Sequence, residues 1–262
     1  MPRLLSNDQI SEFHDTGFIV QEALFDEGEV AQMRQCFESL ESMAARLEST
    51  GDLDGSHFVL GHKHDEQVIK RVVWAGGSQP YLLDIGADER LTVPAAQLLG
   101  SNEMDQLLSQ AHFKRPNDGV IFGWHQDIQH RDKGNGTWRD VNARGSFVQT
   151  LIVLDAMTDD SGPLMFIPGS GQWGRVDFGD HDYDDPDYTP RRPPQFDEEA
   201  AVTILAKPGD TLFFGPYTAH ASFENTSSTY RRVLINGYAS PGANHRVYPG
   251  EGSCRRLGVE TP

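Results

Sequence analysis

Apolar residues recur at helical spacing in two segments within the first fifty positions. Ser6 opens the first segment, and Gln9 three residues later completes a capping-box pattern that predicts a helix ending by Gly17. The short apolar run at 18–20 predicts a strand, and the apolar residues of 26–47 return every three or four positions. We therefore expect a helix, a strand and a second helix, with the apolar residues of the second helix in a core.

Beyond about residue 58 the pattern changes to short apolar runs that are separated by turn residues. One more helix is expected over 93–108, with its apolar side chains directed inward. The predicted strands are all short, and they are 68–74, 112–114, 120–127, 147–154, 164–167, 202–206, 211–214 and 232–238. Short strands at such spacing indicate an antiparallel sandwich or barrel.

The chain shows no internal repeat and no linker, so 1–262 is interpreted as a single domain. Within it, 1–110 is expected to form a helical and β flank, and 111–240 a β core. Two long polar segments, 128–145 and 171–199, interrupt that core. Loops of this length are uncommon inside a compact domain and are often functional.

Composition narrows the function classes. The chain has 39 acidic and 22 basic residues, a net charge of −17, which disfavours nucleic acid and anionic membranes as partners. No apolar run approaches the roughly 20 residues of a membrane helix, and Cys36 and Cys254 are too few for a disulfide scaffold. A cytoplasmic protein with a small-molecule partner is expected, and its oligomeric state is left open.

A candidate metal site begins at the end of the predicted strand 120–127. His125 and Asp127 are two residues apart and would share a face of that strand, while His220 follows the strand 211–214. Two imidazoles and one carboxylate leave open coordination positions on iron(II), which suits oxygenases. A His-x-Asp pair alone is a weak signal in a chain with ten histidines, and the alternative is a pair of ordinary strand residues. The second histidine at a strand end favours the metal site.

An arginine completes the pattern. Arg231 lies eleven residues beyond His220, where the last core strand is expected to begin. A guanidinium can bind a carboxylate through two parallel hydrogen bonds, and 2-oxoglutarate offers such a group. The alternative for Arg231 is a surface salt bridge in an acid-rich protein, and its place beside the metal pattern favours the co-substrate role.

Several motifs together resemble the phytanoyl-CoA dioxygenase family. They are 125–127, the turn segment 161–170, the block 209–220 and the opening segment 6–18. The resemblance covers nearly the whole chain and implies a mainly β fold with flanking helices, the double-stranded β-helix or jelly-roll barrel. One departure is Gly171, which stands where members commonly have a histidine that is not an iron ligand.

The resemblance also implies roles for individual residues. The implied iron(II) ligands are His125, Asp127 and His220. The implied 2-oxoglutarate residues are Arg231, Ser222, Gln149 and His112. Lys114 would share a strand face with His112 and reach the co-substrate or substrate, although Gln149 and His112 can also be ordinary hydrogen-bonded strand residues. Lys70 and Arg71 are further basic candidates, for which surface charge is the favoured interpretation.

The reaction that the resemblance implies uses dioxygen and 2-oxoglutarate, releases succinate and carbon dioxide, and hydroxylates an unactivated C–H bond of a small molecule. A related halogenase would need a small residue in place of Asp127, so halogenation is disfavoured. Two alternatives stay open: a cupin-like metalloenzyme that uses no oxo-acid, and a non-enzymatic ligand-binding barrel.

The two long segments are expected to form lids over the cavity. Trp138 and Arg139 are the candidate substrate contacts of the first segment, around a flexible middle at 134–136. Further aromatic candidates are Trp173, Tyr183 and Tyr188. The arginines of both segments are Arg139, Arg144, Arg175, Arg191 and Arg192, and they face either an anionic substrate or the acidic cluster at 177–187.

Overall fold

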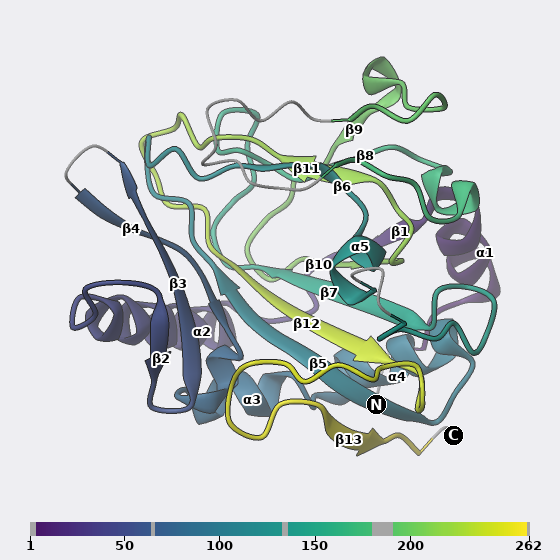
Figure 1. Cartoon of the computed structure of the whole chain (residues 1–262), viewed down its shortest axis with the longest axis horizontal. Helices are drawn as coiled ribbons and strands as arrows, with labels where there is room; N and C mark the ends of the chain where they lie inside the picture. Colours follow the sequence, from purple (N-terminus) through teal and green to yellow (C-terminus); the bar gives the residue numbers. More distant parts are fainter. Residues whose placement is uncertain (1–3, 64–65, 133–135, 180–190, 261–262) are drawn as a thin grey trace.

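The computed structural model describes residues 4–63, 66–132, 136–179 and 191–260, and they form two sheets with helices outside them (Figure 1). The major sheet contains β1 (Phe18–Gln21), β2 (Gly51–Leu53), β3 (Ser56–Lys63), β4 (Glu66–Val73), β5 (Glu103–His112), β7 (Phe147–Val153), β10 (Thr211–Phe214), β12 (Val233–Ala239) and β13 (Arg255–Gly258). The minor sheet contains β6 (Phe122–His125), β8 (Met165–Phe166), β9 (Val202–Thr203) and β11 (His220–Ser222).

Neighbouring strands in both sheets are antiparallel. The major sheet runs β1-β10-β7-β12-β5-β4-β3-β2, with β13 also paired to β5, and the minor sheet runs β6-β11-β8-β9. Strands that are distant in sequence therefore lie side by side, as β1 and β10 do. This is the expected mainly β architecture, a jelly roll with flanking helices.

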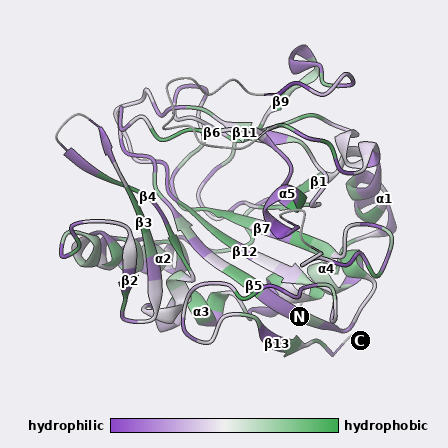
Figure 2. Ribbon diagram, viewed as in Figure 1, coloured by the Kyte–Doolittle hydropathy of each residue, from purple (hydrophilic) through white to green (hydrophobic). Residues whose placement is uncertain are grey.

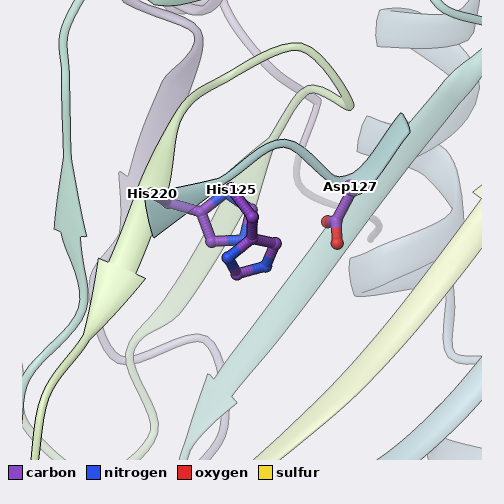
Figure 3. Close-up of side chains that lie close together, drawn as sticks. All are labelled: His125, Asp127 and His220. Carbon is purple, nitrogen blue, oxygen red and sulfur yellow. The ribbon is translucent and has the colours of Figure 1, made fainter. Parts of the chain in front are cut away.

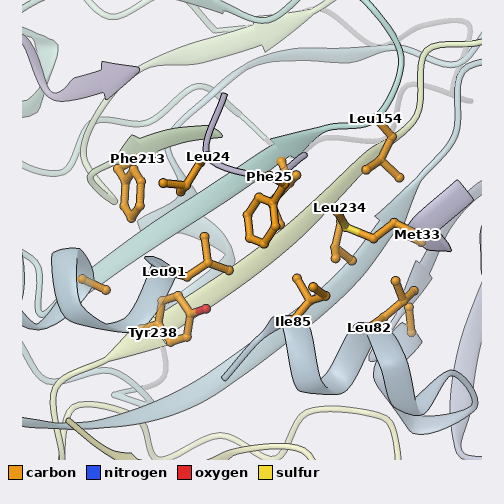
Figure 4. Close-up of a cluster of buried hydrophobic side chains, with 14 of the residues drawn as sticks. Leu24, Phe25, Met33, Leu82, Ile85, Leu91, Leu154, Phe213, Leu234 and Tyr238 are labelled. Atoms are coloured by element: carbon orange, nitrogen blue, oxygen red, sulfur yellow. The ribbon is translucent and has the colours of Figure 1, made fainter. Parts of the chain in front are cut away.

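Three helices cover one face of the major sheet: α2 (Glu27–Ala44), α3 (Pro80–Ile85) and α4 (Glu89–Leu99). Leu234 and Tyr238 of β12 project into this layer and belong to one buried apolar cluster with Met33 and Leu91 (Figure 4). Burial of such side chains contributes roughly 1.5–3 kcal/mol each. The helical layer therefore forms the main core of the fold.

The N-terminal helix, α1 (Asn7–Thr16), forms for the reasons that the sequence predicts. The Ser6 hydroxyl accepts from the Gln9 N–H, and the Gln9 side chain accepts from the Ser6 N–H. Gly17 ends the helix with φ +94°, a conformation that favours glycine. The predicted strand at 18–20 is also confirmed as β1.

The predicted helix over 93–108 is only partly correct. α4 stops at Leu99, Gly100 takes φ +67°, and β5 begins at Glu103. Gln106, Leu107, Leu108 and Ser109 are all buried in β5, and Leu107 is the extra residue of a β-bulge opposite Gly237 and Tyr238. Burial on both faces removes the alternation that marks a strand, so the apolar run resembled a helix.

The opposite face of the major sheet lies across a gap from the minor sheet. All seven residues of β7 are buried, and Figure 2 shows the green hydrophobic colour along most of it, whereas α5 (Asp127–Arg131) is largely purple and hydrophilic. The strands β3, β4 and β5 come from the predicted flank, 1–110, yet they extend the sheet beyond β12.

No helix in the described part of the chain has the length and apolar character to cross a membrane.

Candidate iron and 2-oxoglutarate site

A cavity of about 300 Å³ lies between the two sheets. Its floor comes from the face of the major sheet that the helices leave uncovered, through residues such as Gln149, Ile235 and His112. Its other wall comes from β6, α5 and β11, which contribute His125, Asp127 and His220 among others. All predicted metal-binding and co-substrate residues line this one cavity.

The three predicted metal ligands lie together. His125 ends β6 and His220 begins β11, and the two are direct partners in the strand pairing, with ring centroids 4.2 Å apart. Asp127 is the first residue of α5, so the expectation that it shares a strand with His125 is wrong. The strand ends at His125, and the turn into α5 brings the Asp127 carboxylate to the same space (Figure 3). One ligand atom from each residue lies within 4.8 Å of the others.

The donor set fits a divalent cation. The Nδ1 atom of His125 lies 2.7 Å from the Gly123 carbonyl oxygen, and that of His220 lies 2.8 Å from the Thr218 carbonyl oxygen. A ring that donates from Nδ1 to a carbonyl carries its lone pair on Nε2, the atom used for metal ligation. The buried Oδ2 atom of Asp127 has no hydrogen-bond partner within the described residues. A bound cation would satisfy that oxygen.

Gln126 stands between two of the ligands and is fully buried. Its amide nitrogen donates to the carbonyl oxygens of Gly174 (2.9 Å) and Tyr217 (2.6 Å), and its amide oxygen accepts from the N–H of Val176 (2.9 Å). The bond to Tyr217 connects the segment of His125 to the segment that leads to His220, and the other two bonds connect it to residues 174–176. Gln126 is therefore a positioning residue, which the sequence pattern did not reveal.

Arg231 is buried in the same cavity, two residues before β12, with 2% of its surface exposed. Two of its guanidinium nitrogens, Nε and one Nη, have no hydrogen-bond partner in the described chain. Burial lowers the pKa of Arg231 to about 10, so it remains protonated at neutral pH. A buried cation without a partner is unfavourable, and a carboxylate would satisfy it through two parallel hydrogen bonds.

Ser222, Gln149 and His112 line the cavity as well. The Gln149 side-chain oxygen is buried without a partner among the described residues. His112 shares a hydrogen bond of 2.9 Å with Gln110, and its ring stacks on Phe122. Burial first, and then the nearby cations Arg71, Arg231 and Lys114, hold the pKa of His112 well below its ordinary value of 6.5. Its ring is therefore neutral at physiological pH.

Lys114, Trp138 and Arg139 are not among the residues that line the cavity. The Lys114 ammonium is buried and donates to the backbone carbonyls of Ser222 (2.8 Å) and Phe223, so it joins the segment that follows β5 to the end of β11. Trp138 is buried against Phe147 and donates to a backbone carbonyl, while Arg139 is exposed. None of the three residues lines the cavity, so their contact with a substrate stays a prediction.

Four of the arginines in the two candidate lid segments have side-chain partners away from the cavity. Arg144 contacts His14, Arg175 pairs with Asp132, Arg191 with Asp177, and Arg192 with Glu198. Trp173 lies in the short 3-10 helix Ser170–Trp173 and contributes to a buried cluster. Tyr183 and Tyr188, the glycine-rich middle at 134–135 and most of the cluster at 177–187 lie outside the described residues.

Sequence reasoning missed several cavity residues. Arg131, Arg246 and Tyr248 line the cavity, and so does Arg71, for which surface charge was the favoured interpretation. Arg131 lies four residues after Asp127 and shares its helix face. A spacing of four residues indicates a shared face only within a helix. The five residues of α5 are too few to show the apolar period that predicts a helix from sequence.

Comparison with known proteins identifies the family of this chain. A model of the phytanoyl-CoA dioxygenase family matches residues 13–233, and the chain belongs to this family. An ectoine dioxygenase of Bordetella bronchiseptica is 27% identical over 253 residues, which cover 90% of this chain and 76% of the relative. An L-proline trans-4-hydroxylase of Streptomyces griseoviridis is 31% identical over 149 residues, 49% of this chain and 52% of the relative.

The crystal structure of EctD from S. alaskensis with 2-oxoglutarate and 5-hydroxyectoine superposes with a TM-score of 0.70 at 23% identity. The match covers 98% of this chain and 86% of the other. This likeness establishes the jelly-roll fold. Family membership and the His-Asp-His group together make the chain an iron(II)- and 2-oxoglutarate-dependent dioxygenase.

Proposed function

We propose that this dioxygenase hydroxylates a compact small molecule, with iron(II) held by His125, Asp127 and His220 and the distal carboxylate of 2-oxoglutarate held by Arg231. The observation that supports it best is the buried, unpartnered guanidinium of Arg231 in the cavity of the three ligands. A structural arginine would have a carboxylate or carbonyl partner in the fold. Arg231 instead has two donors available for a ligand.

Iron(II) together with 2-oxoglutarate supplies the activation of dioxygen that oxidises a C–H bond and yields succinate and carbon dioxide. The residues of the chain fix the positions of the metal ligands and of the oxo-acid. The carbonyl oxygens of Gly123 and Thr218 orient the two imidazoles, and Arg231 orients the oxo-acid with Ser222 and Gln149 beside it. The apolar residues of the cavity wall exclude water from the reaction, and they include Val233, Ile235, Leu164 and Phe214.

Cavity size restricts the substrate. A volume of about 300 Å³ lies at the lower end of the roughly 300–1,000 Å³ of small-molecule sites. A substrate that shares this volume with 2-oxoglutarate must be compact, which favours small metabolites over coenzyme A thioesters. Ectoine and L-proline, after which the two relatives are named, are suitable first substrates to test.

Two alternatives are less well supported. A metalloenzyme that uses no oxo-acid would leave the Arg231 donors unexplained, and a non-enzymatic barrel would not need the three convergent ligands.

We also infer a cytoplasmic location, because Cys36 and Cys254 are both free thiols and disulfides are rare in that compartment. Fractionation of the source cells would test this location.

The test of the function uses the full chain under anaerobic conditions. Iron(II) should bind at one ion per chain, and addition of 2-oxoglutarate should produce the visible charge-transfer absorption of the chelate. Exposure to air with a metabolite panel that includes ectoine and L-proline should release succinate in proportion to a hydroxylated product. Iron binding without any 2-oxoglutarate complex would support the enzyme that uses no oxo-acid, and absence of iron binding would support the non-enzymatic barrel.

A further inference from the structure

The cavity has a charge opposite to that of the chain. Although the net charge is −17, the described cavity wall carries four arginines (Arg71, Arg131, Arg231 and Arg246) and a single carboxylate, Asp127. The formal charges of iron(II), dianionic 2-oxoglutarate, Arg231 and Asp127 cancel. Three guanidinium groups then remain in the cavity without a compensating charge.

Arg71 extends from β4 into the cavity, beside its strand partner His112. Its guanidinium has neither a hydrogen bond nor an ion pair with the residues that the structure describes. Burial first, and then the positive charge of Arg131, lower the pKa of Arg71. Two cations thus face the same space from opposite walls, one from the floor and one from α5.

Arg131 is buried, with 5% of its surface exposed. Its guanidinium lies 5.3 Å from the ring centroid of Phe147 and 5.1 Å from that of Tyr248, and it donates to the Tyr248 hydroxyl (2.9 Å). Its Nε atom is buried without a partner in the described chain. Arg246 packs on the same Tyr248 ring and donates to a backbone carbonyl. Aromatic faces orient these groups, but they supply no full negative charge.

This cationic group is distinct from the co-substrate end of the cavity. Arg231 precedes β12 and Arg71 lies on β4, with β5 between them, so their strands are roughly 10 Å apart at the spacing of about 4.8 Å per strand. Arg131 shares a helix face with Asp127, and Cβ atoms four residues apart are about 5–6 Å from one another. The group therefore lies within a small molecule's length of the metal ligands.

We propose that Arg71 and Arg131, with Arg246 beside them, bind an oxyanion of the substrate, so that this dioxygenase acts on small metabolites that carry a carboxylate or a phosphate. The inference rests on the proposed function, since it takes Arg231 as the partner of 2-oxoglutarate. Anchoring the anionic end at α5 leaves the rest of the substrate to extend toward the iron. Guanidinium groups suit this task because they bind carboxylates and phosphates in a planar, bidentate manner.

Direct binding measurements test this inference. The protein, with iron(II) and with or without 2-oxoglutarate, is titrated anaerobically in a calorimeter with matched probes: L-proline against L-prolinamide, glycerol phosphate against glycerol, and inorganic phosphate. At least one oxyanion should bind about tenfold or more tightly than the matched probe that lacks the anionic group, because hydrogen bonds to charged groups are the stronger ones. The carboxylate and phosphate arms distinguish the two sources of the anion.

Variants locate the binding. Arg71→Gln and Arg131→Gln should each weaken the preferred oxyanion about tenfold, while Arg131→Lys, which keeps the charge, should weaken it less. Arg144→Gln removes the same charge from an exposed loop residue and should change nothing. All variants should retain the absorption of the 2-oxoglutarate complex, which also shows that they fold.

Two results would overturn the inference: no oxyanion binds more tightly than the matched probe that lacks the anionic group, or Arg71→Gln and Arg131→Gln bind it like the parent. If the parent protein showed no absorption of a 2-oxoglutarate complex, the proposed function would be contradicted instead. Oxyanion binding is measured independently of that absorption, so the two failures are distinguishable.

Discussion

The two faces of the major sheet differ in what their side chains do. Leu234 of β12 is directed to the helices and is fully buried in the main apolar cluster, whereas its neighbour Ile235 lines the cavity. Arg231 lies unpartnered in the cavity, but the adjacent Arg232 pairs with Asp155 outside it. Alternation along one strand thus places folding stability on one face and ligand binding on the other. Substitutions on the two faces should therefore have separable effects.

The largest effect is expected at the metal ligands. His125→Ala, Asp127→Ala and His220→Ala should each abolish tight iron(II) binding, because each removes one of three protein ligands. Metal analysis after anaerobic loading and desalting provides the measurement. Retention of iron at the parent level in all three variants would contradict the ligand set. Asp127→Gly is a sharper probe, since it keeps the two histidines and opens a coordination site that chloride could occupy.

The next effect concerns two adjacent arginines. Arg231→Ala should weaken 2-oxoglutarate binding by about 2–5 kcal/mol while iron remains bound, because the variant leaves the co-substrate carboxylate without its partner. Arg232→Ala is the matched control; it breaks the pair with Asp155 and should lower stability without affecting 2-oxoglutarate. Titration of the visible absorption measures both. Equal weakening in the two variants would show that the assignment of the two faces is incorrect.

The helix-covered face should show the converse. Leu234→Ala should lower the free energy of unfolding by about 2–5 kcal/mol, as large-to-small substitutions in a packed core do. Iron and 2-oxoglutarate affinities of the folded variant should stay unchanged. Ile235→Ala should cost less, because part of its side chain borders the cavity rather than packed atoms. Chemical denaturation measures the free energy of unfolding of both variants. A larger decrease for Ile235→Ala than for Leu234→Ala would contradict the proposed difference between the two faces.

The smallest effect is a pH dependence from the cavity face. The pKa of His112 in the folded protein is below its ordinary value of 6.5, so the unfolded chain takes up the proton first as the pH falls. The stability from this group is therefore complete above pH 6.5 and decreases below it, by at most about 1.4 kcal/mol per pH unit. Denaturation of the metal-free protein between pH 7 and 5 should show a shallower slope for His112→Gln.

Local signals made some of this structure predictable from sequence. The capping box joins Ser6 to Gln9, only three residues away, so the start of α1 could be predicted without knowledge of any tertiary contact. The strand β5 was missed because burial on both faces erased its period of two. Asp127 was assigned to a strand because the turn after His125 has no distinctive residue.

The predicted site was incomplete for a related reason. The ligands and Arg231 follow from spacing along the chain, whereas Arg71 reaches the cavity only because β4 pairs with β5, and that pairing is a tertiary fact. Arg131 was hidden by the brevity of α5. The loop arginines attracted attention instead, and four of the five have side-chain partners elsewhere, while Arg139 is exposed.

The Gln126 amide has a consequence for how the enzyme acquires its metal. One of its three backbone bonds joins the two histidine segments through Tyr217, and the other two fix the same side chain to residues 174–176. Little conformational entropy then remains to be lost on metal loading. Selectivity among divalent ions would then depend on a fixed arrangement of donors, and a chelator could remove the metal without unfolding the barrel. The apoprotein would be a resting form that is ready to be refilled.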